Sequence, residues 1–341
     1  KWKEIVEVRN FNENNLKNIS DKFPINVFCC VTGVSGSGKS TLVKRGLIPY
    51  MQRYLDGYFE NVNSDHLIGG SLKQIKQMEF VDQNPIGKSS RSNPVTYVKA
   101  FDEVRNLFAD QGLSKSRNYK PGFFSFNVEG GRCEVCQGEG EITVEMQFMA
   151  DIRLPCEACK GKRYKSETLE VVYNGKSISD ILDLTVDEAV EFFGSDENNN
   201  TARKIKEKLN ALQAVGLGYV HLGQSSSTLS GGEAQRIKLG SFLISINNTL
   251  PTLFVFDEPT TGLHFHDVSK LLKSFDALLR KGHSVVVIEH NLDVIKCADW
   301  IIDIGPEGGE NGGNIVFEGT PDDIIKEKKS HTGRYLKDKL V

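Results

Sequence analysis

The deciding stretch of this chain reads Val27-Phe28-Cys29-Cys30-Val31-Thr32-Gly33-Val34-Ser35-Gly36-Ser37-Gly38-Lys39-Ser40. Its apolar first part predicts a buried strand, and a helical pattern begins at Thr41. Between them, glycines let successive backbone N–H groups turn inward as a nest for phosphate oxygens, and the helix start adds positive charge. Strand, loop and helix in this order form a phosphate-binding loop. We expect ATP to bind at Gly33, Val34, Ser35, Gly36, Ser37, Gly38, Lys39, Ser40 and Thr41, with Lys39 on the β- and γ-phosphates and Ser40 on Mg²⁺.

Two acidic residues follow a second apolar run, at residues 253–256. Asp257 is placed to hold Mg²⁺, and Glu258 to polarise the attacking water as general base. Gln83 is expected to sense Mg²⁺ and the γ-phosphate, and His290 to contact the γ-phosphate from the end of a further strand. Each residue alone is more often a solvated surface group, so the prediction depends on their order along the chain. Together with Lys39, the candidate catalytic residues are Gln83, Glu258 and His290.

The segment Leu229-Ser230-Gly231-Gly232-Glu233 makes no phosphate site by itself. We expect Ser230 and the N–H groups of Gly231 and Gly232 at a helix start, where they would cap a γ-phosphate held by a different cassette. This predicts two ATPase units, or cassettes, with ATP bound at the interface between them. ATP binding would favour the closed pair, and hydrolysis would let the two units separate.

Four of the seven cysteines form two pairs, Cys133-x-x-Cys136 and Cys156-x-x-Cys159, with nineteen residues between them. This is the spacing of a structural Cys₄ zinc site. Apolar and polar residues alternate over 141–148, with Ile142, Val144, Met146 and Phe148 as the apolar set, which predicts a strand leading out of the first pair. Redox chemistry is the alternative for a Cys-x-x-Cys motif, but two pairs together favour Zn²⁺.

Basic residues cluster around the cysteines, and clustered Lys and Arg suffice for contacts with DNA phosphates. A solvated protein surface is the alternative for such clusters. The candidate DNA contacts are Lys88, Arg91, Lys115, Arg117, Arg132, Lys162 and Arg163.

The order of apolar and helical patterns predicts an α/β fold with a mostly parallel sheet flanked by helices. We expect strands at 252–256 and 284–288 and helices at 95–108, 202–215 and 267–279. Residues 1–86 and 246–341 are interpreted as the two parts of an ATPase core. Residues 87–245 are interpreted as an inserted domain, with the zinc module at about 125–165.

Composition narrows the class of protein further. The net charge is −3, so a nucleic-acid surface has to be local rather than global. No apolar run approaches the ~20 residues that cross a bilayer, and no signal peptide is visible. The odd cysteine count favours a reducing compartment, so we expect a cytoplasmic protein without a membrane partner. The chain begins at Lys1 and is interpreted as a fragment.

At this point the chain resembles the UvrA family of excinuclease proteins, specifically the C-terminal half of its members. The resemblance includes the ATPase motifs, which many proteins share, and three more specific stretches: one well before the cysteines, one at the first cysteine and one near the end of the chain. These are Arg91-Ser92-Asn93-Pro94, Gly130-Gly131-Arg132-Cys133 and Ile304-Gly305-Pro306-Glu307-Gly308-Gly309.

The resemblance implies an ABC-type ATPase core (a P-loop NTPase) with an inserted helical signature domain that carries the Cys₄ module. It implies an ATPase that recognises DNA damage in nucleotide excision repair, with no nuclease activity of its own. The implied partners are damaged duplex DNA, a second cassette in the N-terminal half of the family's proteins, a second copy of the protein, and the excinuclease B subunit.

Alternatives remain open at this stage. Ser225-Ser226-Ser227 departs from the family's usual sequence, which leaves open a paralogue used for drug or toxin resistance. A transporter ATPase subunit is a more distant alternative, because such subunits normally lack a Cys₄ module. A zinc-stabilised DNA-binding module with an inactive ATPase is disfavoured, because the expected catalytic residues are all present.

Overall fold

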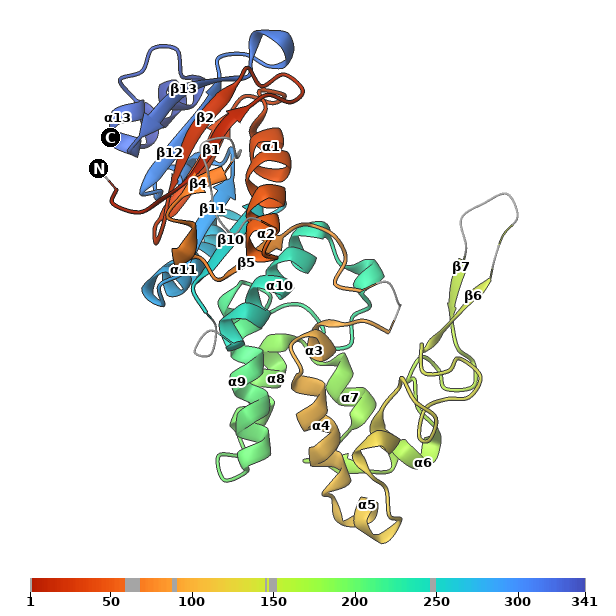
Figure 1. Ribbon diagram of the computed structural model, residues 1–341. Helices are drawn as coiled ribbons and strands as arrows, with labels where there is room; N and C mark the ends of the chain where they lie inside the picture. The colour runs from red at the N-terminus through yellow and green to blue at the C-terminus, as the bar shows by residue number, and fades with distance from the viewer. Residues whose placement is uncertain are drawn as a thin grey trace. The chain divides into compact units, whose positions relative to one another are not determined.

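A computed structural model of the protein describes residues 2–58, 68–87, 91–144, 146, 152–245 and 250–340. The chain divides into two compact units (Figure 1). The first unit combines Lys1–Gln83 with Ser245–Val341, and the second is Asn84–Ile244. Among the described residues, no helix has both the length and the apolar character needed to cross a bilayer.

The first unit contains a six-stranded sheet with the strand order β13-β12-β3-β11-β10-β5. Neighbouring strands are parallel except β12 and β13, which are antiparallel. The strands are β3 (Phe28–Gly33), β5 (Gln77–Val81), β10 (Thr252–Asp257), β11 (Ser284–Ile288), β12 (Trp300–Gly305) and β13 (Asn314–Gly319). All of β11, and all but the last residue of β3 and β10, are buried, as expected for parallel strands covered on both faces.

A second sheet of the first unit is antiparallel, with the order β2-β1-β4. Its strands are β1 (Ile5–Phe11), β2 (Ile19–Pro24) and β4 (Ile68–Gly70). Buried apolar residues of both sheets form one core together with the helical segment that follows β3. That segment is α1 (Lys39–Thr41), the π-helical η1 (Leu42–Leu47) and α2 (Ile48–Leu55). Since this core fixes β3 and the segment after it, it also fixes the glycine-rich loop between them.

The remaining helical elements of the first unit follow the strands. They are η2 (Leu72–Gln74), α11 (Phe265–Arg280), α12 (Leu292–Ile295), η6 (Gly309–Asn311), α13 (Pro321–Ile324), α14 (His331–Leu336) and η7 (Lys337–Lys339).

The second unit is mainly helical, and α9 packs against both α4 and α8. Helix α9 buries Ala202, Ile205, Leu209 and Leu212, which recur at helical spacing along one face. Its elements are α3 (Pro94–Tyr97), α4 (Ala100–Ala109), α5 (Gly112–Ser116), η3 (Pro121–Phe124), β6 (Glu141–Val144), β7 (Ile152–Pro155), α6 (Ser166–Leu169), β8 (Val172–Tyr173), β9 (Lys176–Ser177), α7 (Ile178–Asp183), α8 (Val186–Gly194), α9 (Asn200–Ala214), η4 (Ser226–Thr228) and α10 (Gly231–Ser245).

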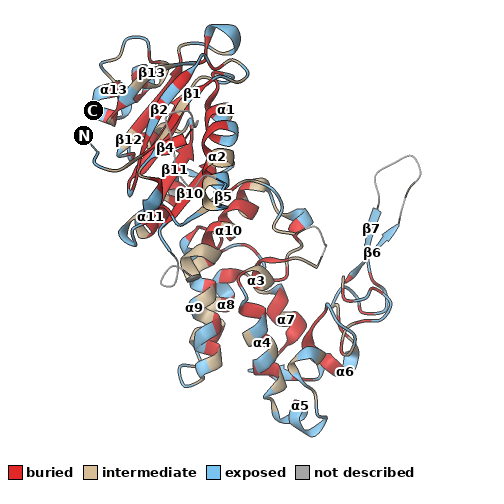
Figure 2. Cartoon of the chain, in the orientation of Figure 1, coloured by how far each residue is buried: buried red, intermediate tan, exposed pale blue. Residues whose placement is uncertain are grey.

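Strands β6 and β7 pair as an antiparallel ribbon whose described residues are exposed (Figure 2). Ile142 lies opposite Leu154 and Val144 opposite Ile152, so the four apolar side chains share one face. The strand predicted from the alternation over 141–148 is therefore confirmed over 141–144, whereas Glu145, Gln147 and Phe148 lie outside the described residues. The alternation did not predict that the apolar face would be exposed.

The helix expected at 95–108 is interrupted. Asn93 caps α3 by accepting a hydrogen bond from the Thr96 N–H, and Lys99 then adopts a left-handed conformation (φ 56°) before α4 begins. The apolar periodicity continues across this break, so periodicity alone could not reveal it.

Candidate nucleotide and metal sites

The loop between β3 and α1 has the backbone that a phosphate nest needs. Gly36 and Gly38 have positive φ angles of 74° and 117°. A Cβ at Gly38 would lie 2.4 Å from Leu16 Cδ2, and one at Gly33 would lie 2.1 Å from the Ile304 carbonyl oxygen. These positions therefore require glycine. The loop borders a pocket of about 330 Å³, lined by Asn15, Ser35, Gly36, Gly38, Lys39, Ser40, Thr41 and Glu258.

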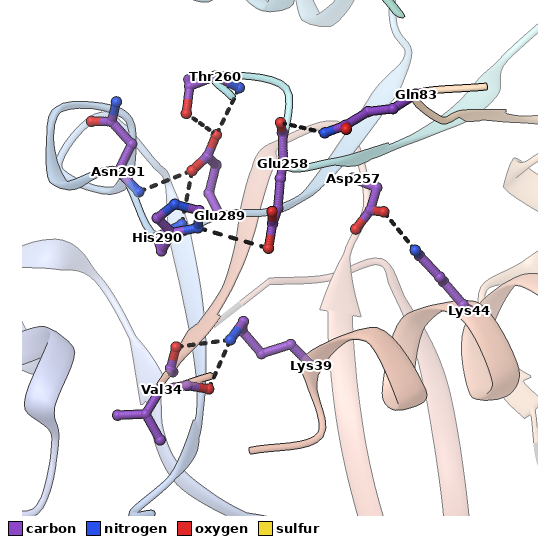
Figure 3. Close-up of polar contacts among 11 residues, drawn as sticks. Val34, Lys39, Lys44, Gln83, Asp257, Glu258, Thr260, Glu289, His290 and Asn291 are labelled. Carbon is purple, nitrogen blue, oxygen red and sulfur yellow. Dashed lines mark hydrogen bonds and ion pairs between the residues drawn. The ribbon is translucent and has the colours of Figure 1, made fainter. Parts of the chain in front are cut away.

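Lys39 folds back over this loop (Figure 3). Its Nζ donates to the carbonyl oxygens of Gly33 and Val34, each at 2.9 Å. Burial lowers the pKa of the Lys39 ammonium, while the negative charges of Glu258 and Asp303 act in the opposite direction. The Lys39 ammonium is thus a largely buried hydrogen-bond donor held at the phosphate loop.

Three of the other expected residues follow neighbouring strands: Gln83 follows β5, Glu258 follows β10 and His290 follows β11. Because these strands and β3 are parallel neighbours, their C-terminal ends and the loop after β3 lie along the same edge of the sheet. Glu258 follows β10 in a left-handed conformation (φ 47°). Its N–H donates to the Ile288 carbonyl oxygen at 2.9 Å, and its own carbonyl accepts from Gln83 Nε2 at 3.3 Å. His290 Nδ1 lies 3.8 Å from Glu258 Oε1. The fold therefore brings Gln83, Glu258 and His290 together, as Figure 3 shows.

Asp257, the expected Mg²⁺ ligand, lies beside a cation that sequence reasoning missed. Lys44 Nζ is 2.5 Å from Asp257 Oδ2. Lys44 follows Lys39 by five residues along the helical segment, and no sequence pattern identified it as a partner of Asp257.

Glu289 is a second residue that sequence reasoning missed. Its carboxylate is fully buried and accepts hydrogen bonds from both the segment after Glu258 and the segment around His290. The only signal in the sequence was an acidic residue directly after the apolar strand pattern at 284–288.

Ser230, Gly231 and Gly232 belong to the second unit and stand at the start of α10. The Glu233 N–H donates to Ser230 Oγ at 3.2 Å, and the Ser230 N–H donates to Glu233 Oε2 at 2.7 Å. This reciprocal cap fixes the start of the 15-residue helix, where the positive end of the helix dipole lies.

The four expected metal ligands lie together in the second unit, where the Sγ atoms of Cys133, Cys136, Cys156 and Cys159 are all within 4.8 Å of one another. Cys133 Sγ is 3.9 Å from Cys156 Sγ, and Cys136 Sγ is 3.6 Å from Cys159 Sγ. A tetrahedral zinc with Zn–S bonds of about 2.3 Å requires sulfurs about 3.8 Å apart. The donor set and its spacing therefore fit Zn²⁺.

The candidate DNA-binding residues differ in the contacts that they make within the protein. Arg91, Lys115 and Arg117 form ion pairs with Glu139, Asp110 and Glu170. Lys88 lies outside the described residues.

Three further candidates lie in or beside the cysteine module. Arg163 donates to the Gly223 carbonyl and lies over the Phe126 ring, which are structural contacts. Arg132 donates to the Asn127 carbonyl at 3.2 Å. Lys162 is exposed, and the described residues include no carboxylate within ion-pair distance of it.

Comparison with curated proteins gives extensive similarity to proteins named UvrABC system protein A. The chain is 56% identical over 325 residues to the protein of Aquifex aeolicus (strain VF5), covering 95% of this chain and 34% of the relative. It is 53% identical over 338 residues to the protein of Clostridium perfringens (strain 13 / Type A), covering 97% of this chain and 34% of the relative. The chain belongs to the UvrA family. No family model matches it.

A solved UvrA-family structure supports the same assignment. The crystal structure of UvrA2 from Deinococcus radiodurans superposes with a TM-score of 0.89 at 46% identity, over 100% of this chain and 40% of that chain. The predicted fold class, an ABC-type α/β core with an inserted domain, is therefore confirmed. The chain spans about a third of the length of the UvrA relatives it matches.

Proposed function

We propose that this chain supplies one ATPase cassette of a DNA-damage recognition subunit of nucleotide excision repair. The observation that carries the proposal is that Lys39 and Glu258 line one pocket at the phosphate loop, with His290 3.8 Å from Glu258, in a chain that also holds the Cys₄ cluster. The chain is 56% identical to a UvrABC system protein A and 46% identical to UvrA2, which favours the repair subunit over a resistance paralogue.

In the proposed hydrolysis step, the loop N–H groups and Lys39 bind the β- and γ-phosphates of ATP. Glu258 accepts a proton from the attacking water. At the same time the water oxygen bonds to the γ-phosphorus, and the bond between the γ-phosphorus and the bridging β-phosphate oxygen breaks. His290 donates to the γ-phosphate oxygens, and Gln83 orients the water. Ser40 and Asp257 would hold Mg²⁺, which neutralises the developing phosphate charge.

The proposed partners follow from the same assignment. Ser230, Gly231 and Gly232 would complete an ATP site on another cassette, supplied by the rest of a full-length protein or by a second copy. The Cys₄ cluster would bind Zn²⁺ and hold the exposed ribbon in place. The proposed partners also include damaged duplex DNA and the excinuclease B subunit. The proposed location is the cytoplasm.

The test uses the full-length protein containing this chain, with wild type and Glu258→Gln compared. DNA binding is measured on damaged and undamaged duplexes, with and without ATP, over a salt titration. An ATP-dependent preference for damaged duplex in wild type, altered in Glu258→Gln, would support the proposal. Tight ATP binding without DNA affinity at any salt concentration would refute it.

A further inference from the structure

Glu289 connects two segments that carry the proposed chemistry. One of its carboxylate oxygens accepts hydrogen bonds from the N–H of Thr260, at 3.0 Å, and from the Thr260 hydroxyl. The other accepts from the N–H groups of His290, at 2.8 Å, and Asn291, at 2.9 Å. Four donors converge on a side chain with 0% exposure, which suits the acceptor-only carboxylate form. Figure 3 shows these contacts meeting at Glu289.

This carboxylate has no cationic partner among the described residues, because none of the ion pairs of the structure includes it. Burying a charge without such a partner is costly, and backbone donors stabilise it here. A core position that only needed filling would be served better by an apolar side chain. The buried carboxylate therefore points to a role that depends on its four acceptor positions.

The reacting side chains, in contrast, are open to solvent. The side chains of His290 and Glu258 are 62% and 41% exposed, and they are 3.8 Å apart. With this exposure, the protein covers the tips of these two side chains only in part. Their backbones are fixed instead, because Thr260 lies two residues after Glu258 and the His290 N–H donates directly to Glu289.

We propose that Glu289 is a positioning residue for ATP hydrolysis, which ties the segment Glu258–Thr260 to the segment His290–Asn291 and so sets His290 against Glu258. The inference rests on the proposed function. We expect removal of the tie to leave phosphate binding intact, because none of the four hydrogen bonds to the Glu289 carboxylate comes from the loop from Gly33 to Thr41.

The main experiment substitutes Glu289→Gln in the full-length protein. Glutamine has the same shape but replaces one acceptor oxygen by an N–H₂ donor, which then faces backbone N–H donors. We expect kcat for ATP to fall about 10-fold or more, as for other small displacements of catalytic groups. The KM and the affinity for a fluorescent ATP analogue should stay within about 3-fold of wild type. Glu327→Gln, a glutamate outside the phosphate site, is the matched control.

A double-mutant comparison separates positioning from general damage. If Glu289 acts through His290, Glu289→Gln should have little further effect on kcat in a His290→Ala background. Multiplicative losses would overturn the proposal, as would an unchanged kcat in Glu289→Gln. Thr260→Val provides a milder variant, since it removes only the hydroxyl donor, and it should lower kcat less than Glu289→Gln.

Hydrogen exchange tests the tie without relying on turnover. Peptides covering 257–264 and 288–296 should both exchange faster in Glu289→Gln than in Glu327→Gln, whereas the peptide covering 33–41 should not. Unchanged exchange in either segment would refute the tie. If wild type does not hydrolyse ATP, the proposed function fails, and the exchange result still decides whether Glu289 joins the two segments.

Discussion

Lys44 Nζ lies 2.5 Å from Asp257 Oδ2, so a cation of the chain occupies the carboxylate that we assign to Mg²⁺. The Lys44 side chain is 39% exposed, and solvent therefore weakens the pair. Mg²⁺ and the ammonium nevertheless carry charges of the same sign and share one ligand. Their binding to Asp257 is expected to be competitive.

We predict that Lys44→Met lowers the Mg²⁺ concentration for half-maximal binding of a fluorescent ATP analogue by about 3- to 10-fold, because a nearby positive charge is removed. The matched control is Arg45→Met, whose side chain pairs with Glu13 at 2.5 Å. A Mg²⁺ requirement that rises in Lys44→Met would show that Lys44 assists the metal rather than competing with it.

Loss of one thiolate is predicted to release zinc. Cys133→Ala should lower the zinc content by one ion per chain, as measured by mass spectrometry of the metal, and should expose residues 125–165 to proteases. The reason is that binding to a structural site contributes on the order of 10–16 kcal/mol, which a small module cannot replace. Cys297→Ala changes an exposed cysteine outside the cluster and should leave the zinc content unchanged. A zinc-free module that still resists proteases would contradict the structural assignment.

Lys162 is an exposed candidate DNA contact whose charge also acts on the carboxyl groups of Asp180 and Asp183. We predict that Lys162→Glu in the full-length protein weakens binding to all duplex sequences similarly and reduces the slope of log K against log salt by about 1. Lys328→Glu in the first unit is the charge-matched control. An unaltered slope would remove Lys162 from the set of phosphate contacts.

Asp21 on β2 is predicted to make stability depend on pH. Burial is the main cause that raises the pKa of Asp21 well above its ordinary value, and the neighbouring Glu318 adds to it. Because the pKa is raised in the folded state, the contribution of the protonated Asp21 carboxyl to the free energy of unfolding is complete below the unfolded pKa, near 4. This contribution is lost as pH rises through the folded pKa. Each unit of difference removes about 1.4 kcal/mol at high pH.

Asp21→Asn should therefore be more stable than wild type at pH 8, and the advantage should shrink towards pH 4. The measurement is thermal unfolding across this range, with Asp322→Asn, an exposed aspartate of α13, as control. Parallel pH profiles for wild type and Asp21→Asn would rule out the buried carboxyl as the cause.

The sequence predicted those parts of the site that depend on local order. The glycine loop, Lys39 and the strand ends at Asp257 and Ile288 follow from patterns within about ten residues. The sequence also predicted that the four paired cysteines would lie together, because their spacing is itself the signal.

The remainder depends on contacts between distant segments. The pairing of Lys44 with Asp257 and of Glu289 with Thr260 joins residues that no periodicity relates. Cys297 follows a helical pattern with apolar residues but is exposed, and the helix before it, α12, ends at Ile295. Local pattern gave no indication that this helix is so short.

The cysteine pairs stand at the base of the β6–β7 ribbon, and all described residues of β6 and β7 are exposed. The ribbon therefore adds no described residue to the buried core, and Arg153 of β7 joins it to η4 by donating to Ser227 Oγ at 2.7 Å. Insertions or deletions of two residues per strand would preserve which side chains share a face and would leave the base closed. Evolution, and equally a protein engineer, can therefore vary the reach of this ribbon as an appendage while the fold beneath it stays constant.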